Sequence, residues 1–265
     1  MNAHFRALAI SSLLVLHAVC VHAEETAGTA VFTGTITPEA VAKFIEDHPK
    51  GTVSTLVITS AGGDGNASLT LGRWVKENRL DVRVREYCAS GCACAFMAGK
   101  KKIIEPGSIV IWHGSLEQKK FRDLHARYQR LLLKARKGEA LEPGDEAFLE
   151  ENERRFLSLL ESREAVARFF DEVQVNEYIT RIGREPVDFG VDGWTATVPV
   201  MNKFGILNID AADDYGQPDY IARVRNSLPL CKGSCVTFVL DSSGMVQRLE
   251  WAIPKKPRAA PASTP

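Results

Sequence analysis

The 265-residue sequence lacks an excess of charge of either sign, because its 33 lysine and arginine residues match its 33 aspartate and glutamate residues. A basic excess is the electrostatic signature of proteins that bind nucleic acid or anionic membranes, so the balance supports neither partner. Beyond the first two dozen residues, the sequence also lacks an apolar run long enough to cross a membrane. We therefore expect a mature chain without a membrane span and without a nucleic-acid partner.

The longest apolar run lies at the beginning of the sequence. Arg6 is followed by an apolar stretch from Ala7 to Val21, and small residues close it at Val21-His22-Ala23. This order is typical of a cleaved secretory signal peptide. We expect residues 1–23 to be that peptide, the mature chain to begin near Glu24, and the protein to be periplasmic or secreted.

Cysteine is scarce, with six residues in the sequence. Four of them form two C-x₃-C pairs, Cys88 with Cys92 and Cys231 with Cys235. In an exported protein such pairs favour two disulfides. A zinc site with four sulfur ligands is the alternative, although the two pairs are far apart in the sequence. We expect no metal and no organic cofactor.

Strand and helix patterns alternate through the first half of the sequence. Apolar and β-branched runs predict strands, and capping residues, apolar spacing and Gly-rich turns predict the helices between them. Such alternation indicates an α/β fold with a mainly parallel sheet and crossover helices. The expected strands are 30–36, 52–59, 81–85, 102–105 and 109–112, and the expected helices are 37–47, 67–78 and 90–98.

The second half of the sequence is mainly helical at first. Residues 117–183 show two stretches of helical spacing, which predict an insertion or arm. It either packs against the sheet or serves as a lid or an oligomerisation arm, and both interpretations stay open. A strand at 204–208 and a β-hairpin within 236–251 follow, and residues 254–265 have the composition of a disordered tail.

Three strand ends carry residues suited to acyl transfer, which needs a nucleophile, a base and N–H donors for an oxyanion. Ser90 follows a strand and begins a predicted helix, where free N–H groups favour negative charge. His113 follows the apolar strand 109–112, and Gly62-Gly63 follows the strand 52–59. The carboxyl ends of parallel strands meet at one edge of the sheet, so the three features are expected together.

These segments resemble the ClpP and crotonase-like superfamily, particularly exported relatives of the ClpP serine peptidases. The resemblance rests on LVITSAGGDGNASLTLGRWV, on YCASGCACAFMAGKKKIIEPGSIVIWHGS and on VDGWTATVPVMNKFGILN. It implies a spiral of βαβ units over residues 24–212, with a helical insertion at 117–183. A C-terminal hairpin extension at 213–253 lies outside the resemblance.

The resemblance also implies a role for each matching residue. Ser90 would be the nucleophile, His113 its general base, and the amides of Gly63 and Gly91 the oxyanion hole. The third member of the triad would be Asp192, with Asp188 as second choice. These roles describe an exported serine hydrolase that acts on a peptide or protein substrate. The helices of residues 117–183 offer a possible surface for a homo-oligomer.

Three other functions compete with this hypothesis. The fold could persist as a non-catalytic binding or scaffold protein of the cell envelope, because fold alone does not fix function. Acyl-CoA chemistry of the crotonase type would need a cytoplasmic thioester pool, which export argues against. A cysteine nucleophile, Cys92 or Cys94, is the third alternative, because thiolates are favoured at helix N-termini.

Overall fold

The structure is a computed structural model of the chain, and it describes residues 28–112, 119–180, 193–227, 237–240 and 246–248. Strands and helices alternate through the first part of it, as the sequence predicts. The strands there are β1 (Gly28–Thr33), β2 (Val53–Ser60), β3 (Asp81–Ala89), β4 (Lys102–Ile104) and β5 (Ile109–Ile111), and the helices are α1 (Pro38–Asp47), α2 (Gly65–Glu77) and α3 (Cys92–Ala98).

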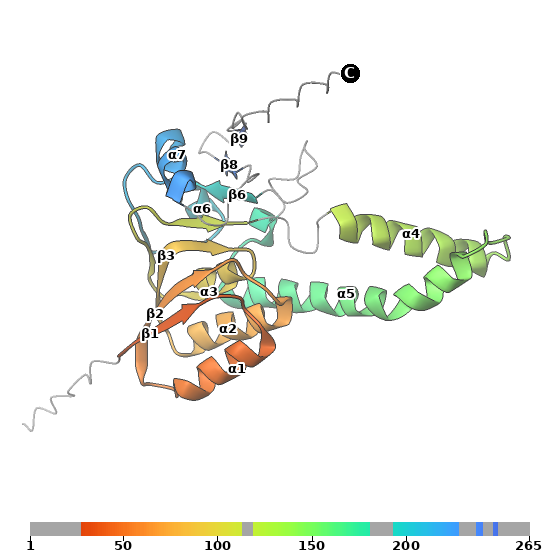
Figure 1. The fold of residues 1–265 in the computed structure, drawn as a ribbon, viewed down its shortest axis with the longest axis horizontal. Helices are drawn as coiled ribbons and strands as arrows, with labels where there is room; N and C mark the ends of the chain where they lie inside the picture. Colours follow the sequence, from red (N-terminus) through yellow and green to blue (C-terminus); the bar gives the residue numbers. More distant parts are fainter. Residues whose placement is uncertain (1–27, 113–118, 181–192, 228–236, 241–245, 249–265) are drawn as a thin grey trace, which may run out of the picture.

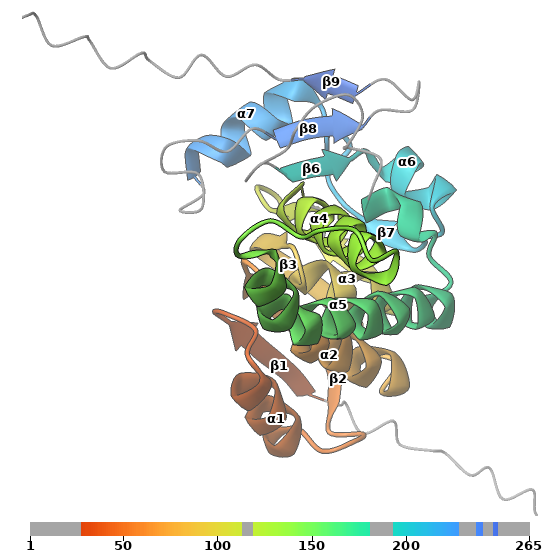
Figure 2. The ribbon, with the colours of Figure 1, turned by 90° about the vertical axis from the view of Figure 1, so that its right-hand side faces the viewer.

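The main sheet is parallel, and its strand order is β1-β2-β3-β4-β7, where β7 is Ile209–Asp210. Strands that follow one another in the sequence lie beside one another, so each connecting helix makes the same right-handed crossover. As a result α1, α2 and α3 pack on one face of the sheet (Figure 1, Figure 2). The α/β class and the mainly parallel sheet predicted from the sequence are confirmed.

Strand β3 has two partners on its far side because it is divided at Glu86, whose φ is 61°. Its first part, around Val82, pairs with β4, and its last part, around Cys88, pairs with β5. The pairing with β2 shifts register over the same interval. This irregularity lets the end of β5 lie beside the end of β3, which is where Ser90 follows.

The core lies between the sheet and its helices and is built by apolar side chains of both layers. Helix α1 begins at a Thr37 cap that accepts a hydrogen bond from the Ala40 N–H, followed by Pro38 in the first turn. The largest fully buried side chains include Leu56, Ile58, Leu71, Leu80, Phe96 and Ile109. The strands that lead to the candidate site are therefore held in place by a packed apolar core.

The predicted helical insertion forms an arm of two helices, α4 (Lys119–Arg136) and α5 (Asp145–Val173), which lie side by side and project from the body (Figure 1). Tyr128 stacks on Phe156 at 4.5 Å between ring centroids, and Arg127 lies over the ring of Phe148. The root of the arm packs on α2, where Phe169 fills the space that the missing side chain of Gly72 leaves. The short helix η2 (Glu177–Thr180) follows.

The remaining elements form a cap beside the main sheet. They are β6 (Gly193–Ala196), α6 (Val198–Lys203), α7 (Pro218–Ser227), β8 (Thr237–Leu240) and β9 (Val246–Arg248). Strand β8 pairs antiparallel with β9 and parallel with β6, so these strands form a second, three-stranded sheet. The predicted strand at 204–208 is wrong, because Gly205 adopts φ 88° in a turn after α6 and the strand begins only at Ile209.

Two predicted segments lie outside the described residues, the signal peptide at 1–23 and the tail at 254–265. Within the residues that the structure describes, no helix is both long and apolar enough to cross a membrane.

Candidate active site

Ser90 occupies the turn between β3 and α3 and adopts a left-handed backbone conformation, with φ at 57°. Side chains other than glycine rarely adopt this conformation, and such outliers are concentrated at functional sites. The turn is held by two backbone hydrogen bonds, from the Ser90 N–H to Ile111 O at 2.9 Å and from the Ala93 N–H to Ser90 O at 3.0 Å. Ser90 is half-buried, so it is not sealed in the core.

The position of Ser90 corrects one expectation from the sequence. The sequence predicts that Ser90 begins the helix, but α3 begins at Cys92 and Gly91 is its N-cap residue. The left-handed conformation at Ser90 is the physical reason, because it turns the chain sharply and delays the first helical residue. Ser90 is therefore displayed on a turn and is not aligned with the helix axis.

The glycine loop after β2 approaches this turn closely. A methyl group on Gly62 would lie 2.8 Å from both Gly91 N and Ser90 Cβ, so a larger residue cannot be accommodated at the contact. Gly62 has φ 90° and its N–H is held by Ser60 Oγ at 3.0 Å. Gly62 thus allows the ends of β2 and β3 to meet.

Gly63 is fixed by its contact with Ile36. The Gly62 carbonyl accepts a hydrogen bond from the Ile36 N–H, and the Asp64 N–H donates to Ile36 O at 2.8 Å. A methyl group on Gly63, whose φ is 156°, would lie 2.1 Å from that carbonyl oxygen. The Gly63 backbone is exposed, and its N–H has no hydrogen-bond partner among the described residues.

Gly91 provides a second backbone N–H next to Ser90. A methyl group at Gly91 would lie 3.8 Å from Gly63 N and only 2.1 Å from the buried Ser68 Oγ. Within the part of the chain that the structure describes, the Gly91 N–H is likewise without a hydrogen-bond partner. The structure therefore brings together Ser90, Gly63 and Gly91, three of the residues singled out in the sequence.

A disulfide between Cys88 and Cys92 spans the same turn, with Cα atoms 5.2 Å apart, as the sequence predicts for this pair. Both cysteines are fully buried. Cys88 belongs to β3 and Cys92 to α3, so the bond joins the two elements between which Ser90 lies. It leaves neither sulfur as a thiol, which argues against Cys92 as a nucleophile.

Cys94, the other cysteine considered as a nucleophile, is a half-buried free thiol. Burial raises the pKa of its thiol to about 12, against a smaller opposing effect of Arg73. A thiol of this kind is almost fully protonated near neutral pH and is a poor nucleophile. The structure therefore favours Ser90 over Cys94.

Two tyrosines hold the strand that leads to His113, and sequence reasoning missed both. Tyr215 accepts a 3.1 Å hydrogen bond from the Val110 N–H and shares a 3.0 Å hydrogen bond with Thr195 Oγ1, and Tyr220 donates to Ser108 O at 2.7 Å. Burial raises the pKa of Tyr215, which keeps its hydroxyl neutral. No local sequence signal links these residues to β5, because more than a hundred residues separate each tyrosine from its partner strand.

The other predicted site residues lie outside the described residues, namely His113, Asp188 and Asp192, as do Cys231 and Cys235. Trp112 precedes His113, and Trp194 lies two residues after Asp192. These two tryptophans exchange backbone hydrogen bonds of 2.8 and 2.7 Å. The indole N–H of Trp112 is buried and has no hydrogen-bond partner among the described residues. Among the described residues, no group of histidine, cysteine and acidic side chains is arranged to hold a metal ion.

Comparisons with known proteins assign no family. No family model matches the chain, and no curated protein matches it. Among solved structures, the chain is similar to a mutant ClpP1 from Listeria monocytogenes, with 18% sequence identity and a TM-score of 0.39 over 70% of this chain and 92% of that one. A TM-score of this size carries no argument about function, so the description of the site rests on its own geometry.

Proposed function

We propose that the chain is a ClpP-like serine hydrolase that cleaves peptide bonds, with Ser90 as its nucleophile. The observation that carries the proposal is the pair of backbone N–H groups, of Gly63 and Gly91, that lie next to Ser90 and have no partner among the described residues. Gly63 is exposed and Gly91 is half-buried, so neither residue is sealed in the core. Two free amides beside a displayed hydroxyl are the arrangement that stabilises an oxyanion.

In this proposal Ser90 Oγ attacks the carbonyl carbon of a peptide bond while His113 takes the hydroxyl proton. The negative oxygen of the tetrahedral intermediate accepts hydrogen bonds from Gly63 and Gly91, and the bond to the leaving amine breaks as His113 returns the proton. Water then hydrolyses the acyl-enzyme through the same base. Asp192, with Asp188 as second choice, orients His113 and stabilises its protonated form.

The described neighbours of the other two triad members support this assignment. Strand β5 ends two residues before His113, and its Ile111 carbonyl is bonded to the Ser90 N–H. Trp194, two residues after Asp192, is paired with Trp112, which precedes His113. The described residues that adjoin His113 and Asp192 in the sequence are thus connected to the turn of Ser90.

The proposal includes export to the periplasm or the cell exterior. Two features support it, the signal-like order of residues 1–23 and the Cys88–Cys92 disulfide at the core of the site. Disulfides persist in oxidising compartments and are rare in the cytosol.

The proposal also includes self-association through the arm. Leu133 on α4 and Leu157 and Leu160 on α5 are exposed, although large apolar side chains elsewhere in the described chain are mostly buried. Leu157 and Leu160 are three residues apart and therefore share a face of α5. Exposed leucines on a projecting pair of helices fit a contact between copies of the chain.

A serine-reactive fluorophosphonate probe tests the proposed function. We expect the folded protein to be labelled, and we expect Ser90→Ala and His113→Gln to abolish labelling without loss of stability. Ser158→Ala is the matched control, because Ser158 is an exposed serine on the arm and its loss should change nothing. Absence of labelling in the folded protein would overturn the proposal and favour the non-catalytic scaffold.

A further inference from the structure

A second site of interest lies at the opposite end of the main sheet. A cavity of about 280 Å³ opens where β4 begins, and it is bordered by the ends of α2, α3 and α5 and by the turn before β7. Val82, near the start of β3, pairs with Lys102 there, whereas Ser90 follows the end of the same strand. The residues that matter for its chemistry are Lys76, Met97, Lys100, Lys102, Glu172 and Leu207.

Lys102 is unusual because it is a buried lysine without an acidic partner. It is only 6% exposed, and its Nζ donates a 2.6 Å hydrogen bond to Gly99 O at the end of α3. None of the described carboxylates forms an ion pair with it. Burial lowers the pKa of its ammonium group to about 8. An ammonium group has three donor protons, and the Gly99 carbonyl takes one of them.

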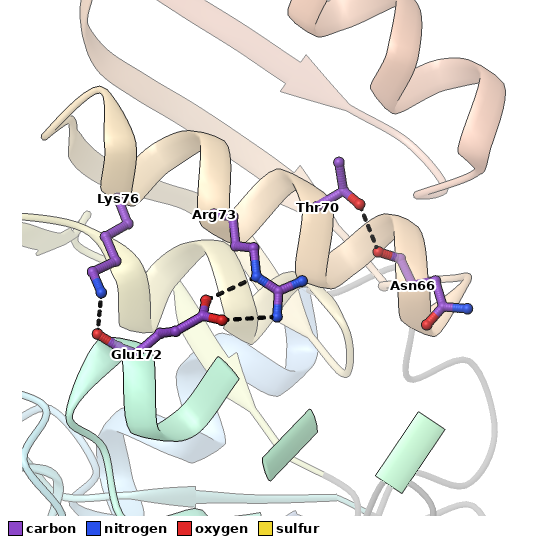
Figure 3. A network of polar contacts seen from close by, with 5 residues as sticks. All are labelled: Asn66, Thr70, Arg73, Lys76 and Glu172. Carbon is purple, nitrogen blue, oxygen red and sulfur yellow. Dashed lines mark hydrogen bonds and ion pairs between the residues drawn. The ribbon is translucent and has the colours of Figure 1, made fainter. Parts of the chain in front are cut away.

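The charge of the cavity is positive because its acidic side chain is already neutralised. Glu172 receives two hydrogen bonds from Arg73, of 2.8 and 3.1 Å, and Lys76 Nζ donates to the Glu172 carbonyl oxygen (Figure 3). The Arg73 guanidinium lowers the pKa of Glu172, which keeps this ion pair formed near neutral pH. Lys76, Lys100 and Lys102 line the cavity, and the acidic residue of its lining, Glu172, is already paired with Arg73.

The same cavity has an apolar side. Met97 is buried beside Lys102, whereas Leu207 is 54% exposed. A large apolar side chain exposed next to a cavity can contact the apolar part of a ligand. The cavity thus combines ammonium donors with an apolar wall, within a volume suited to a small molecule.

We propose that this cavity binds a small aliphatic carboxylate, whose anionic end is held by Lys102 and Lys76 and whose hydrocarbon part contacts Met97 and Leu207. Hydrogen bonds from ammonium to carboxylate are stronger than those between neutral groups, and a partly buried site strengthens them further. The site is independent of the proposed hydrolase, because it lies at the other end of the strands and uses none of the triad residues.

Isothermal titration calorimetry with hexanoate tests this site, with 1-hexanol as the uncharged counterpart. We expect hexanoate to bind and 1-hexanol to bind at least about 10-fold more weakly. Lys102→Met should lower the affinity for hexanoate by about 10-fold or more. Lys101→Met is the matched control, because Lys101 is exposed, is paired with Asp210 and does not line the cavity. The affinity of this variant for hexanoate should equal that of the wild type.

Titration of Lys102 by NMR provides a readout that a purely structural lysine would not give. A bound carboxylate stabilises the ammonium form, so hexanoate should raise the pKa of Lys102 above about 8. Affinity should fall between about pH 7 and about pH 9 in the wild type as Lys102 loses its proton, and Lys102→Met should lack this decrease although Lys76, Lys100, Arg73 and Glu172 remain. Hexanoate affinity that is equal in wild type and Lys102→Met, or no binding at millimolar hexanoate, would overturn the proposal.

Discussion

The Ser90 N–H donates a 2.9 Å hydrogen bond to the carbonyl oxygen of Ile111, which joins the turn after β3 to the last residue of β5. On its other side the turn contacts Gly62, which lies in the loop between β2 and α2. Backbone contacts, the Ser60 side chain and the Cys88–Cys92 disulfide thus hold three strand ends together. A site built in this way is pre-organised, because no side-chain rearrangement is needed to bring the amides to Ser90.

The close contact of Gly63 with Ile36 predicts that Gly63→Ala is severely damaging. The new methyl group would meet the Ile36 carbonyl oxygen at 2.1 Å, and a backbone atom cannot move aside cheaply. We expect a loss of at least about 2 kcal/mol in the free energy of unfolding, measured by urea denaturation, and loss of probe labelling. Gly65→Ala is the control, because nothing lies within 4 Å of its new methyl group; equal damage by both changes would contradict the account.

Gly91→Ala should slow the labelling of Ser90 because its methyl group clashes with the Ser68 side chain, and a second substitution at Ser68 can remove that clash. Its methyl group would lie 2.1 Å from Ser68 Oγ and 2.8 Å from Ser68 Cβ, and both atoms belong to a side chain. We expect labelling of Ser90 to slow by at least about 10-fold, as expected when an oxyanion donor is displaced. Combining Gly91→Ala with Ser68→Gly should restore much of the labelling rate. A double variant as slow as Gly91→Ala alone would show that the contact is not the cause.

Removal of the disulfide tests whether it positions Ser90. The loop that it closes is short, so the double variant Cys88→Ala/Cys92→Ala should lose only about 2 kcal/mol in the free energy of unfolding by the chain-entropy estimate. The labelling rate should fall more than this loss explains, because the left-handed turn is no longer braced from both sides. Both quantities are measured on the same folded sample, and an unchanged labelling rate would assign the disulfide to stability alone.

The raised pKa of Cys94 predicts slow alkylation. Iodoacetamide reacts with thiolates, and a thiol whose pKa is about 12 is almost entirely protonated at pH 8. In the native protein we expect Cys94 to react far more slowly than after denaturation, as measured by peptide mass spectrometry. Rapid native alkylation of Cys94, together with loss of activity, would revive the cysteine nucleophile.

The lowered pKa of Lys102 predicts how stability depends on pH. The folded protein holds the Lys102 proton with a pKa of about 8 instead of the usual 10.5, so the unfolded chain binds more protons between these values. Stability should therefore rise with pH over this window, and the desolvation penalty should be fully present below about pH 8. Lys102→Met should lack this rise in urea denaturation, whereas Lys101→Met should keep it. A wild type and a Lys102→Met variant with parallel pH profiles would refute the burial argument.

Self-association through the arm predicts a change of mass in solution. Leu157→Glu combined with Leu160→Glu places two charges on the exposed apolar face of α5, and we expect this variant to be monomeric in light scattering when the wild type is not. Ser158→Glu changes a neighbouring residue of the same helix that is already exposed and polar and points in another direction, so it should leave the oligomer intact. A wild type that is monomeric at all concentrations tested would exclude the arm as an interface.

The sequence predicted the βαβ order and the Cys88–Cys92 disulfide because both depend on local patterns. Apolar periodicity defines a strand or a helix within ten or so residues, and the Thr37-Pro38 cap marks the start of α1. The C-x₃-C spacing at Cys88 likewise places two cysteines near one another whatever the rest of the fold does.

The geometry of the candidate site could not be predicted from local sequence patterns. The left-handed turn at Ser90 depends on contacts with Gly62 and Ile111, which come from other strands. Long-range packing sets the division of β3 at Glu86, the hydrogen bond between Tyr215 and β5, and the pairing of β8 with β6. No repeat or spacing in the sequence encodes such contacts.

The most direct test of the central claim is a crystal structure of the protein after reaction with a fluorophosphonate. We predict a phosphonyl group on Ser90 Oγ, with its non-bridging oxygen about 2.7–3.1 Å from both Gly63 N and Gly91 N. An adduct on another residue, or a phosphonyl oxygen that approaches neither amide, would contradict it.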